Sequence, residues 1–262
     1  MRTRASAAVV VIAALLAAGC ATSPPFPSEP QTGTLFHRYR EPSGPGPFPA
    51  VVLLHTCAGV RGHLYTWAER LAAAGYASLI VDSFTPRGGA ACNIPSYFPA
   101  TLDQVTDDAF AALAHLRARP AIDARRIGVM GFSYGASAAL RTSSALYRRR
   151  GGFQAAVAFY PLCVTWRASL PADAQARSNN LLDDIEVPTL ILMGEADNDT
   201  PNVAANCAHA VDRLRRAGRP VAITLYPGAG HVFDVRDPEA TRAAAAAMLE
   251  FFGRHLGRSS PA

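Results

Sequence analysis

Three residues of this 262-residue chain, Ser133, Asp197 and His231, are of the types that carry out nucleophilic acyl transfer. Ser133 lies in the sequence G-F-S-Y-G at residues 131–135, between an apolar run and a stretch of small residues with a helical pattern. A sharp strand-to-helix turn of this kind exposes the serine hydroxyl, and its glycines remove side chains that would collide with the adjoining elements. A serine hydroxyl is a weak nucleophile at neutral pH, so a histidine must accept its proton and an acid must orient that histidine.

The order of these residues along the chain supports the same chemistry. Each follows an apolar run typical of a buried strand, and polar side chains at the carboxyl ends of parallel strands meet at one edge of a sheet. The order serine, acid, histidine is that of α/β-hydrolases. Asp199 is a rival acid, but it precedes Thr200 and Pro201 at a predicted helix start, where a capping role suits it better. We therefore predict Asp197 as the acid of the triad.

The elements that must position these residues alternate between strands and helices. Predicted strands occupy residues 34–40, 50–54, 77–81, 127–130, 155–159, 189–193 and 221–226, and predicted helices occupy residues 64–74, 102–117, 136–146, 203–216 and 239–256. The first strand alternates apolar and polar residues, as expected at a sheet edge, and the others are mostly continuous apolar runs. This order predicts a single α/β domain: a mostly parallel sheet with helices on both faces. The loops at residues 83–99 and 164–186 are expected to line the site.

Acyl transfer also needs two hydrogen-bond donors for the oxyanion that forms on the substrate. One is expected to be the backbone N–H of Tyr134, directly after the nucleophile, and the other the backbone N–H of Cys57 in the loop after His55. His55 ends a predicted strand, and we interpret it as shaping that loop rather than as a base. Cys57 lacks the strand-to-helix turn, which argues against it as the nucleophile.

The first residues predict export from the cytoplasm. Arg2 and Arg4 precede a 12-residue apolar stretch that is too short to remain as a membrane-spanning helix, and small residues then precede Cys20. This pattern resembles a bacterial lipoprotein signal, although Ala17 stands where leucine is usual. We predict a signal peptide at residues 1–19, lipidation at Cys20, a tether at residues 20–33, the catalytic domain at residues 34–257 and a tail at residues 258–262. Location in the periplasm or on the outer membrane follows, with ordinary cleavage and secretion as the alternative.

The remaining cysteines agree with export. Four cysteines in an exported chain suggest two disulfides, for which three pairings exist. We favour Cys57–Cys92 and Cys163–Cys207 because the predicted fold brings those loops together; four buried free thiols are the alternative. The net charge of +5 falls to about +3 without the signal peptide, and we interpret the basic run at residues 148–150 as a solvated helix end rather than a nucleic-acid site. No histidine pair has metal-ligand spacing, so no metal is predicted.

Five segments together resemble the dienelactone hydrolase family of the α/β-hydrolase superfamily: residues 51–59, 82–88, 131–135, 194–201 and 226–233. The resemblance implies hydrolysis of a carboxylic ester or lactone through an acyl-enzyme, without a cofactor. The enzymes that name the family have cysteine at the position of Ser133, so a dienelactone is not implied as the substrate. Arg87 lies in a loop similar to one in which those enzymes hold a substrate carboxylate, and a structural salt bridge is the alternative for it.

The sequence thus predicts a serine hydrolase that cleaves a small ester or lactone at the cell envelope. A peptidase or acyl transferase with the same triad is a second hypothesis, but it would need a larger cleft, and the chain has no propeller or lid domain to make one. A binding lipoprotein without catalytic activity is a third hypothesis. The presence of serine, acid and histidine at three strand ends argues against it.

Overall fold

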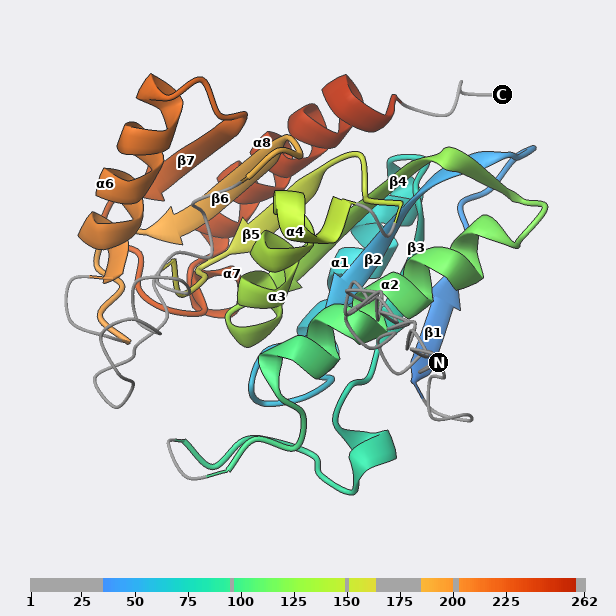
Figure 1. The fold of residues 1–262 in the computed structure, drawn as a ribbon, viewed down its shortest axis with the longest axis horizontal. Helices are drawn as coiled ribbons and strands as arrows, with labels where there is room; N and C mark the ends of the chain where they lie inside the picture. The colour runs from blue at the N-terminus through green and yellow to red at the C-terminus, as the bar shows by residue number, and fades with distance from the viewer. Residues whose placement is uncertain (1–34, 95–96, 149–150, 164–184, 200–202, 258–262) are drawn as a thin grey trace, which may run out of the picture.

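A seven-stranded sheet forms the centre of the computed structural model, which describes residues 35–94, 97–148, 151–163, 185–199 and 203–257 (Figure 1). The strands are β1 (Phe36–Arg40), β2 (Phe48–Leu54), β3 (Ala77–Val81), β4 (Ile122–Phe132), β5 (Ala156–Phe159), β6 (Thr189–Gly194) and β7 (Val221–Tyr226). Their order in the sheet is β1-β3-β2-β4-β5-β6-β7. Only β1 is antiparallel to its neighbour, so the carboxyl ends of the other six strands lie along one edge.

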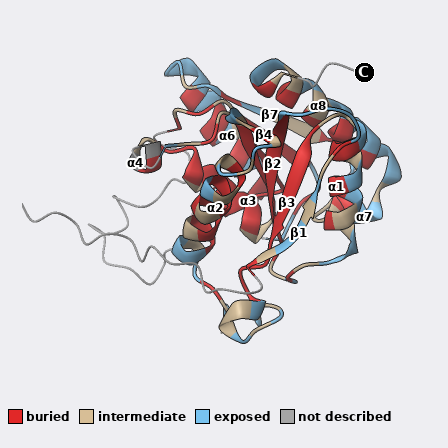
Figure 2. Ribbon diagram, turned by 90° about the vertical axis from the view of Figure 1, so that its right-hand side faces the viewer, coloured by how far each residue is buried: buried red, intermediate tan, exposed pale blue. Residues whose placement is uncertain are grey.

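Helices cover both faces of this sheet, as the alternation of elements predicts. Figure 2 shows α1 (Gly62–Ala73) and α8 (Pro238–Leu256) on one side of the strands, and α2 (Leu102–Arg117), α3 (Tyr134–Thr142) and α6 (Val203–Arg216) on the other. Three shorter helices, η1 (Thr85–Arg87), α4 (Ala145–Arg148) and α7 (Phe233–Arg236), lie in the connections. The predicted fold class, a single α/β domain, is confirmed.

The side chains of β2 show how one strand supports both layers. Val51 and Leu53 belong to the apolar cluster that includes Leu64 and Trp67 of α1. Ala50, Val52 and Leu54 belong to the cluster that includes the buried residues of α2. Successive side chains of a strand point to opposite faces, so a strand covered on both faces has no polar position. All seven residues of β2 are buried.

Two predicted elements differ from the structure by more than two residues at one end. The helix predicted at residues 136–146 ends at Thr142, and α4 begins separately at Ala145. The hydroxyls of Thr142 and Ser143 both donate to the carbonyl of Ala139, and hydroxyl bonds of this kind compete with helix continuation. Strand β4 also begins at Ile122, before the predicted residue 127. The predicted signal peptide, tether, lipidation site and tail, and residues 164–184, lie outside the described residues.

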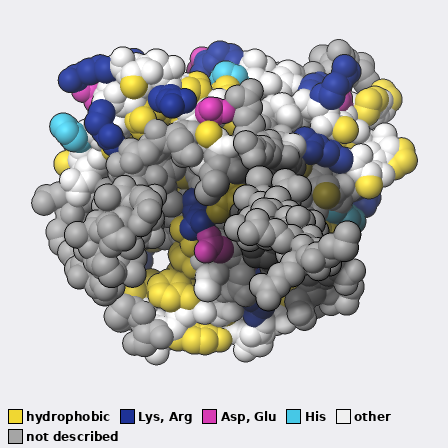
Figure 3. Space-filling model, viewed as in Figure 1, with side chains coloured by type: hydrophobic (Ala, Val, Ile, Leu, Met, Phe, Trp, Pro, Cys, Tyr) yellow, Lys and Arg dark blue, Asp and Glu magenta, His cyan; other side chains and the backbone are white. Residues whose placement is uncertain are grey.

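The described surface carries charges of both signs. Arginines on the face seen in Figure 3 are scattered over several elements, with acidic side chains beside some of them. Within the described ranges, no helix is both long enough and apolar enough to cross a bilayer.

Candidate active site

Ser133 occupies the tight turn between β4 and α3. Its backbone has φ 49° and ψ −111°, a conformation that residues with a side chain rarely adopt and that persists only where the surroundings enforce it. Two glycines permit the turn through close contacts: a Cβ on Gly131 would collide with the carbonyl of Gly135, and a Cβ on Gly135 would lie 2.5 Å from the carbonyl oxygen of His55. The predicted strand, turn and helix therefore form as the G-x-S-x-G spacing requires.

The three predicted triad residues come together at the carboxyl edge of the sheet. His231 Nδ1 lies 2.8 Å from Asp197 Oδ2, and His231 Nε2 lies 3.1 Å from Ser133 Oγ. Because the carboxylate can only accept, Nδ1 carries the proton and Nε2 is free to accept from the serine hydroxyl. The Asp197 side chain has no exposed surface, while 21% of the His231 side chain remains exposed. This arrangement can deprotonate the serine and then protonate a leaving group.

Asp199 occupies a different place from Asp197. Its Oδ2 lies 3.9 Å from His231 Nε2, its side chain is 49% exposed, and its backbone N–H donates to Asp197 Oδ1 at 3.1 Å. Asp199 therefore helps to fix the carboxylate of Asp197 through its backbone, which sequence reasoning did not anticipate. Its predicted capping role concerns residues 200–202, which lie outside the described residues.

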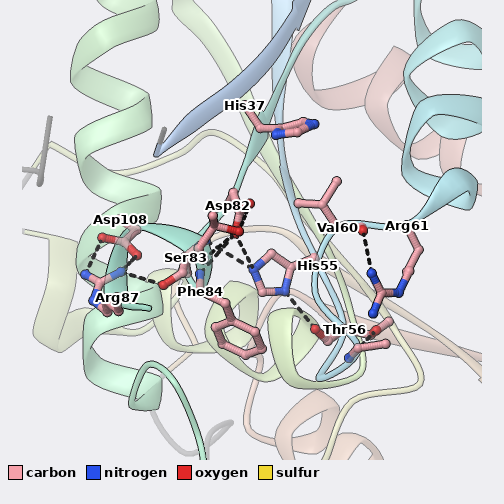
Figure 4. A network of polar contacts seen from close by, with 12 residues as sticks. His37, His55, Thr56, Val60, Arg61, Asp82, Ser83, Phe84, Arg87 and Asp108 are labelled. Carbon is pink, nitrogen blue, oxygen red and sulfur yellow. Dashed lines mark hydrogen bonds and ion pairs between the residues drawn. The ribbon is translucent and has the colours of Figure 1, made fainter. Parts of the chain in front are cut away.

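His55 connects two loops of the site, as Figure 4 shows. Nδ1 of its imidazole donates to the carbonyl of Thr56 at 2.7 Å, and Nε2 accepts from the backbone N–H of Ser83 at 3.1 Å. These partners require the neutral imidazole. Burial lowers the pKa of His55, which favours the same form. The geometry agrees with the prediction that His55 shapes the loop and does not act as a base.

The loop that carries Cys57, one of the two predicted oxyanion donors, is tied to its surroundings. A disulfide joins Cys57 to Cys92, and the Cys92 N–H donates to the Cys57 carbonyl at 2.7 Å. Tyr134 is the first residue of α3, and N–H groups in the first turn of a helix have no intrahelical acceptor. The second disulfide joins Cys163 to Cys207, so both favoured pairings are confirmed.

Arg87 is held away from a substrate role by its partners. Its guanidinium donates to both carboxylate oxygens of Asp108, at 2.8 and 2.9 Å, and to the carbonyl of Ser83 at 2.7 Å. Figure 4 shows this contact on the far side of Ser83 from His55. Of the two alternatives left open by the sequence, the structure contains the salt bridge, and we do not include Arg87 among the substrate-binding residues.

A cleft of about 630 Å³ opens beside His231. It is lined by residues 198–199, residues 228–231, Phe233 and residues 236–238, which include Arg236 and Asp237. This space is large enough for a small organic molecule. Among the described residues, no cluster of three or more His, Cys, Asp or Glu side chains forms a metal site.

Two residues near the triad were missed by sequence reasoning. The ring of Tyr160, which follows β5, packs edge-on against the ring of His231, and its hydroxyl donates to Asp234 in α7. The position of Tyr160 after a strand, like that of the triad residues, is the signal that could have singled it out.

Comparisons with known protein sequences identify relatives of this chain. A sequence model of the Dienelactone hydrolase family matches residues 37–256. A protein of Escherichia coli strain K12, provisionally named carboxymethylenebutenolidase, is 27% identical over 90% of this chain and 88% of its own length. A protein of Methylorubrum extorquens with the same provisional name is 28% identical over 73% of this chain, and the match spans 65% of that relative's length.

Solved structures give the same picture of the fold. A structure from Klebsiella pneumoniae, provisionally named a dienelactone hydrolase, has a TM-score of 0.63 and 26% identity, covering 81% of this chain and 89% of that one. A thermophilic esterase from Thermogutta terrifontis with propionate bound has a TM-score of 0.65 and 19% identity, covering 86% and 90% of the two chains. The second likeness concerns the fold alone.

Proposed function

From the premise that this chain belongs to the dienelactone hydrolase family and is an ester or lactone hydrolase, we propose that it works through an acyl-enzyme on Ser133. The observation that carries the proposal is the hydrogen-bonded series Asp197, His231, Ser133, with 2.8 and 3.1 Å between successive partners. A neutral imidazole aimed at a serine on a strained turn is the arrangement that activates a hydroxyl for attack.

The proposed reaction has two halves that use the same groups. Ser133 Oγ attacks the carbonyl carbon of the ester while His231 Nε2 takes the hydroxyl proton, and Asp197 stabilises the imidazolium. The resulting oxyanion accepts hydrogen bonds from the backbone N–H groups of Tyr134 and Cys57. Collapse expels the alcohol, which takes its proton from His231, and leaves the acyl group on Ser133. Water then attacks the acyl-enzyme by the same steps and releases the carboxylic acid.

The ion pair of Arg87 with Asp108 favours small esters or lactones that need no carboxylate held by that arginine. The cleft beside His231 is lined by charged residues of both signs, Asp199, Arg236 and Asp237. The proposed enzyme therefore differs in substrate from proteins that hold an anionic lactone through that arginine position.

The test is hydrolysis of p-nitrophenyl esters and simple lactones by the wild type and by Ser133→Ala. The proposal is supported if the rate of ester hydrolysis falls by a factor of about 10⁴ or more in Ser133→Ala while the circular dichroism spectrum is unchanged. Full activity in Ser133→Ala would remove Ser133 from the mechanism.

We further propose that the enzyme acts at the cell envelope, anchored by a lipid on Cys20. Support comes from the sequence of residues 1–20 and from the two disulfides, which form and persist in oxidising compartments. Cell fractionation and labelling with a radioactive fatty acid test this: the wild type should sediment with membranes and carry the label, and Cys20→Ala should do neither. A wild type that stays in the cytoplasmic fraction would contradict it.

A further inference from the structure

A buried carboxylate lies directly behind the triad histidine. Asp234 of α7 follows His231 by three residues and is only 9% exposed. Its Oδ1 accepts from the hydroxyl of Tyr160 at 2.6 Å, and its Oδ2 accepts from the indole N–H of Trp67 at 3.0 Å. Within the described part of the chain, no arginine forms an ion pair with it. A buried charge that is stabilised by neutral donors alone needs both bonds, so Asp234 fixes the positions of its two partners.

Tyr160 links this carboxylate to the site. Its side chain is 1% exposed, and its ring lies 4.8 Å from the ring of His231, edge-on at 65°. The backbone of Tyr160 has φ 42°, a left-handed conformation that is unusual for a bulky residue and requires support from its surroundings. Burial, with the Asp234 carboxylate beside it, raises the pKa of Tyr160 well above its usual value, so the phenol keeps the proton that it donates.

The same network reaches the nucleophile from the other side. The Ser133 N–H donates at 2.9 Å to the carbonyl of Phe159, the residue before Tyr160, and the Tyr160 N–H donates at 2.8 Å to Leu192 of β6. Val232, directly after His231, also has a positive φ of 56°. The histidine loop thus enters α7 through a strained residue and is held against the serine turn by the Asp234–Tyr160 bond.

We propose that Tyr160 and Asp234 are positioning residues that hold the imidazole of His231 in line between Asp197 and Ser133. The inference rests on the proposed function. Tyr160 and Asp234 are buried and neither lines the cleft beside His231, so they act through the orientation of the histidine. Losing their bond lets the histidine loop shift, and small displacements of catalytic groups slow the chemical step far more than they weaken binding.

The experiment compares Tyr160→Phe, Asp234→Asn and a matched control in the hydrolysis of p-nitrophenyl acetate. Tyr160→Phe removes only the hydroxyl and should lower kcat about tenfold or more with little change in KM. Tyr226→Phe is the control, because the Tyr226 hydroxyl is also buried, its ring packs on Phe233 beside the same loop, and this hydroxyl has no hydrogen-bond partner among the described residues. Its kcat should stay at the wild-type value.

The double variant Tyr160→Phe with Asp234→Asn tests whether the two residues act through one bond. If both residues act through one bond, the double variant loses no more kcat than the worse single variant. Wild-type kcat in both single variants, with only a lower unfolding temperature, would overturn the inference and leave a structural network. Should Tyr160→Phe fail to fold, the kcat of Asp234→Asn decides in the same way.

The failure of this inference can be told from the failure of the proposed function. Activity in the wild type that disappears in Ser133→Ala but persists in Tyr160→Phe contradicts the positioning role alone. A wild type without ester hydrolysis contradicts the proposed function and this inference with it.

Discussion

The histidine side and the oxyanion side of the site are held in place by different kinds of interaction. On the histidine side, Asp197, His231 and Tyr160 are joined by directional contacts beyond the carboxyl ends of β6, β7 and β5. On the oxyanion side, the loop with Cys57 is joined to the loop with Cys92 by a covalent bond, and the latter loop is fixed to α2 by an ion pair.

The difference follows from what each side must do. The histidine must exchange a proton with two partners, so its surroundings orient it without bonding it covalently. The oxyanion donors are backbone N–H groups that never change state, and their value depends on being fixed before the reaction. Covalent and ionic links add to the packing that already holds these two loops.

The largest expected effect is a loss of kcat on the histidine side, when the acid of the triad is changed. Asp197→Asn should lower kcat by about 10⁴-fold, because an amide no longer holds the imidazole in the tautomer that accepts from serine. Asp199→Asn is the matched control and should change kcat by less than about fivefold, because its contact with Asp197 is made by its backbone. Steady-state ester hydrolysis measures both. A larger loss in Asp199→Asn than in Asp197→Asn would reverse the assignment of the acid.

Removal of each disulfide tests the oxyanion side. The two bonds close segments of similar length, with sequence separations of 35 and 44, so the loss of either should destabilise the fold by about 4 kcal/mol in the chain-entropy view. Only the double variant of Cys57 and Cys92 to alanine should also lower kcat, by about tenfold, since only that bond fixes an oxyanion donor.

Denaturant unfolding measures the stability of the two disulfide variants. Ester hydrolysis measures their kcat, at a temperature where both are folded. Equal kcat values in the two disulfide variants would show that the Cys57–Cys92 bond contributes stability and nothing to catalysis.

The ion pair of Arg87 with Asp108 gives a third comparison. Their side chains are 18% and 5% exposed, so Arg87→Met, which leaves the buried Asp108 without its cation, should cost about 3 kcal/mol of unfolding free energy. Arg87→Met should change the KM for a neutral ester and the KM for an ester that bears a carboxylate by the same factor. A selective rise in KM for the anionic ester would instead identify Arg87 as a substrate-binding residue.

Acid should weaken the fold through its buried histidines, which is the smallest of these effects. Burial lowers the pKa values of His55 and His63, so below about pH 6.5 the unfolded chain takes up protons that the folded chain does not. Stability is therefore complete above that pH and falls as pH decreases, by at most about 1.4 kcal/mol per histidine for each pH unit. Urea unfolding at several pH values measures it, and an unchanged midpoint between about pH 7.5 and 5.5 contradicts it.

Sequence patterns predicted the triad better than the side-chain contacts that surround it, for a physical reason. Ser133, Asp197 and His231 follow buried strands, and strand ends meet at one edge whatever the loops do. The partner of Arg87 depends on how the loop at residues 83–99 folds against α2, which no local pattern encodes. The Tyr160–Asp234 contact joins residues 74 positions apart and requires a strained backbone, so it is visible only in three dimensions.

The most direct test of the central claim is labelling of the mature, disulfide-intact chain with a fluorophosphonate probe, followed by mapping of the modified residue. We predict one modified residue, Ser133, and a labelling rate that collapses in His231→Ala, because the probe reacts with a hydroxyl that the imidazole deprotonates. No labelling of the folded wild type, or equal labelling without His231, would contradict an activated serine at this site.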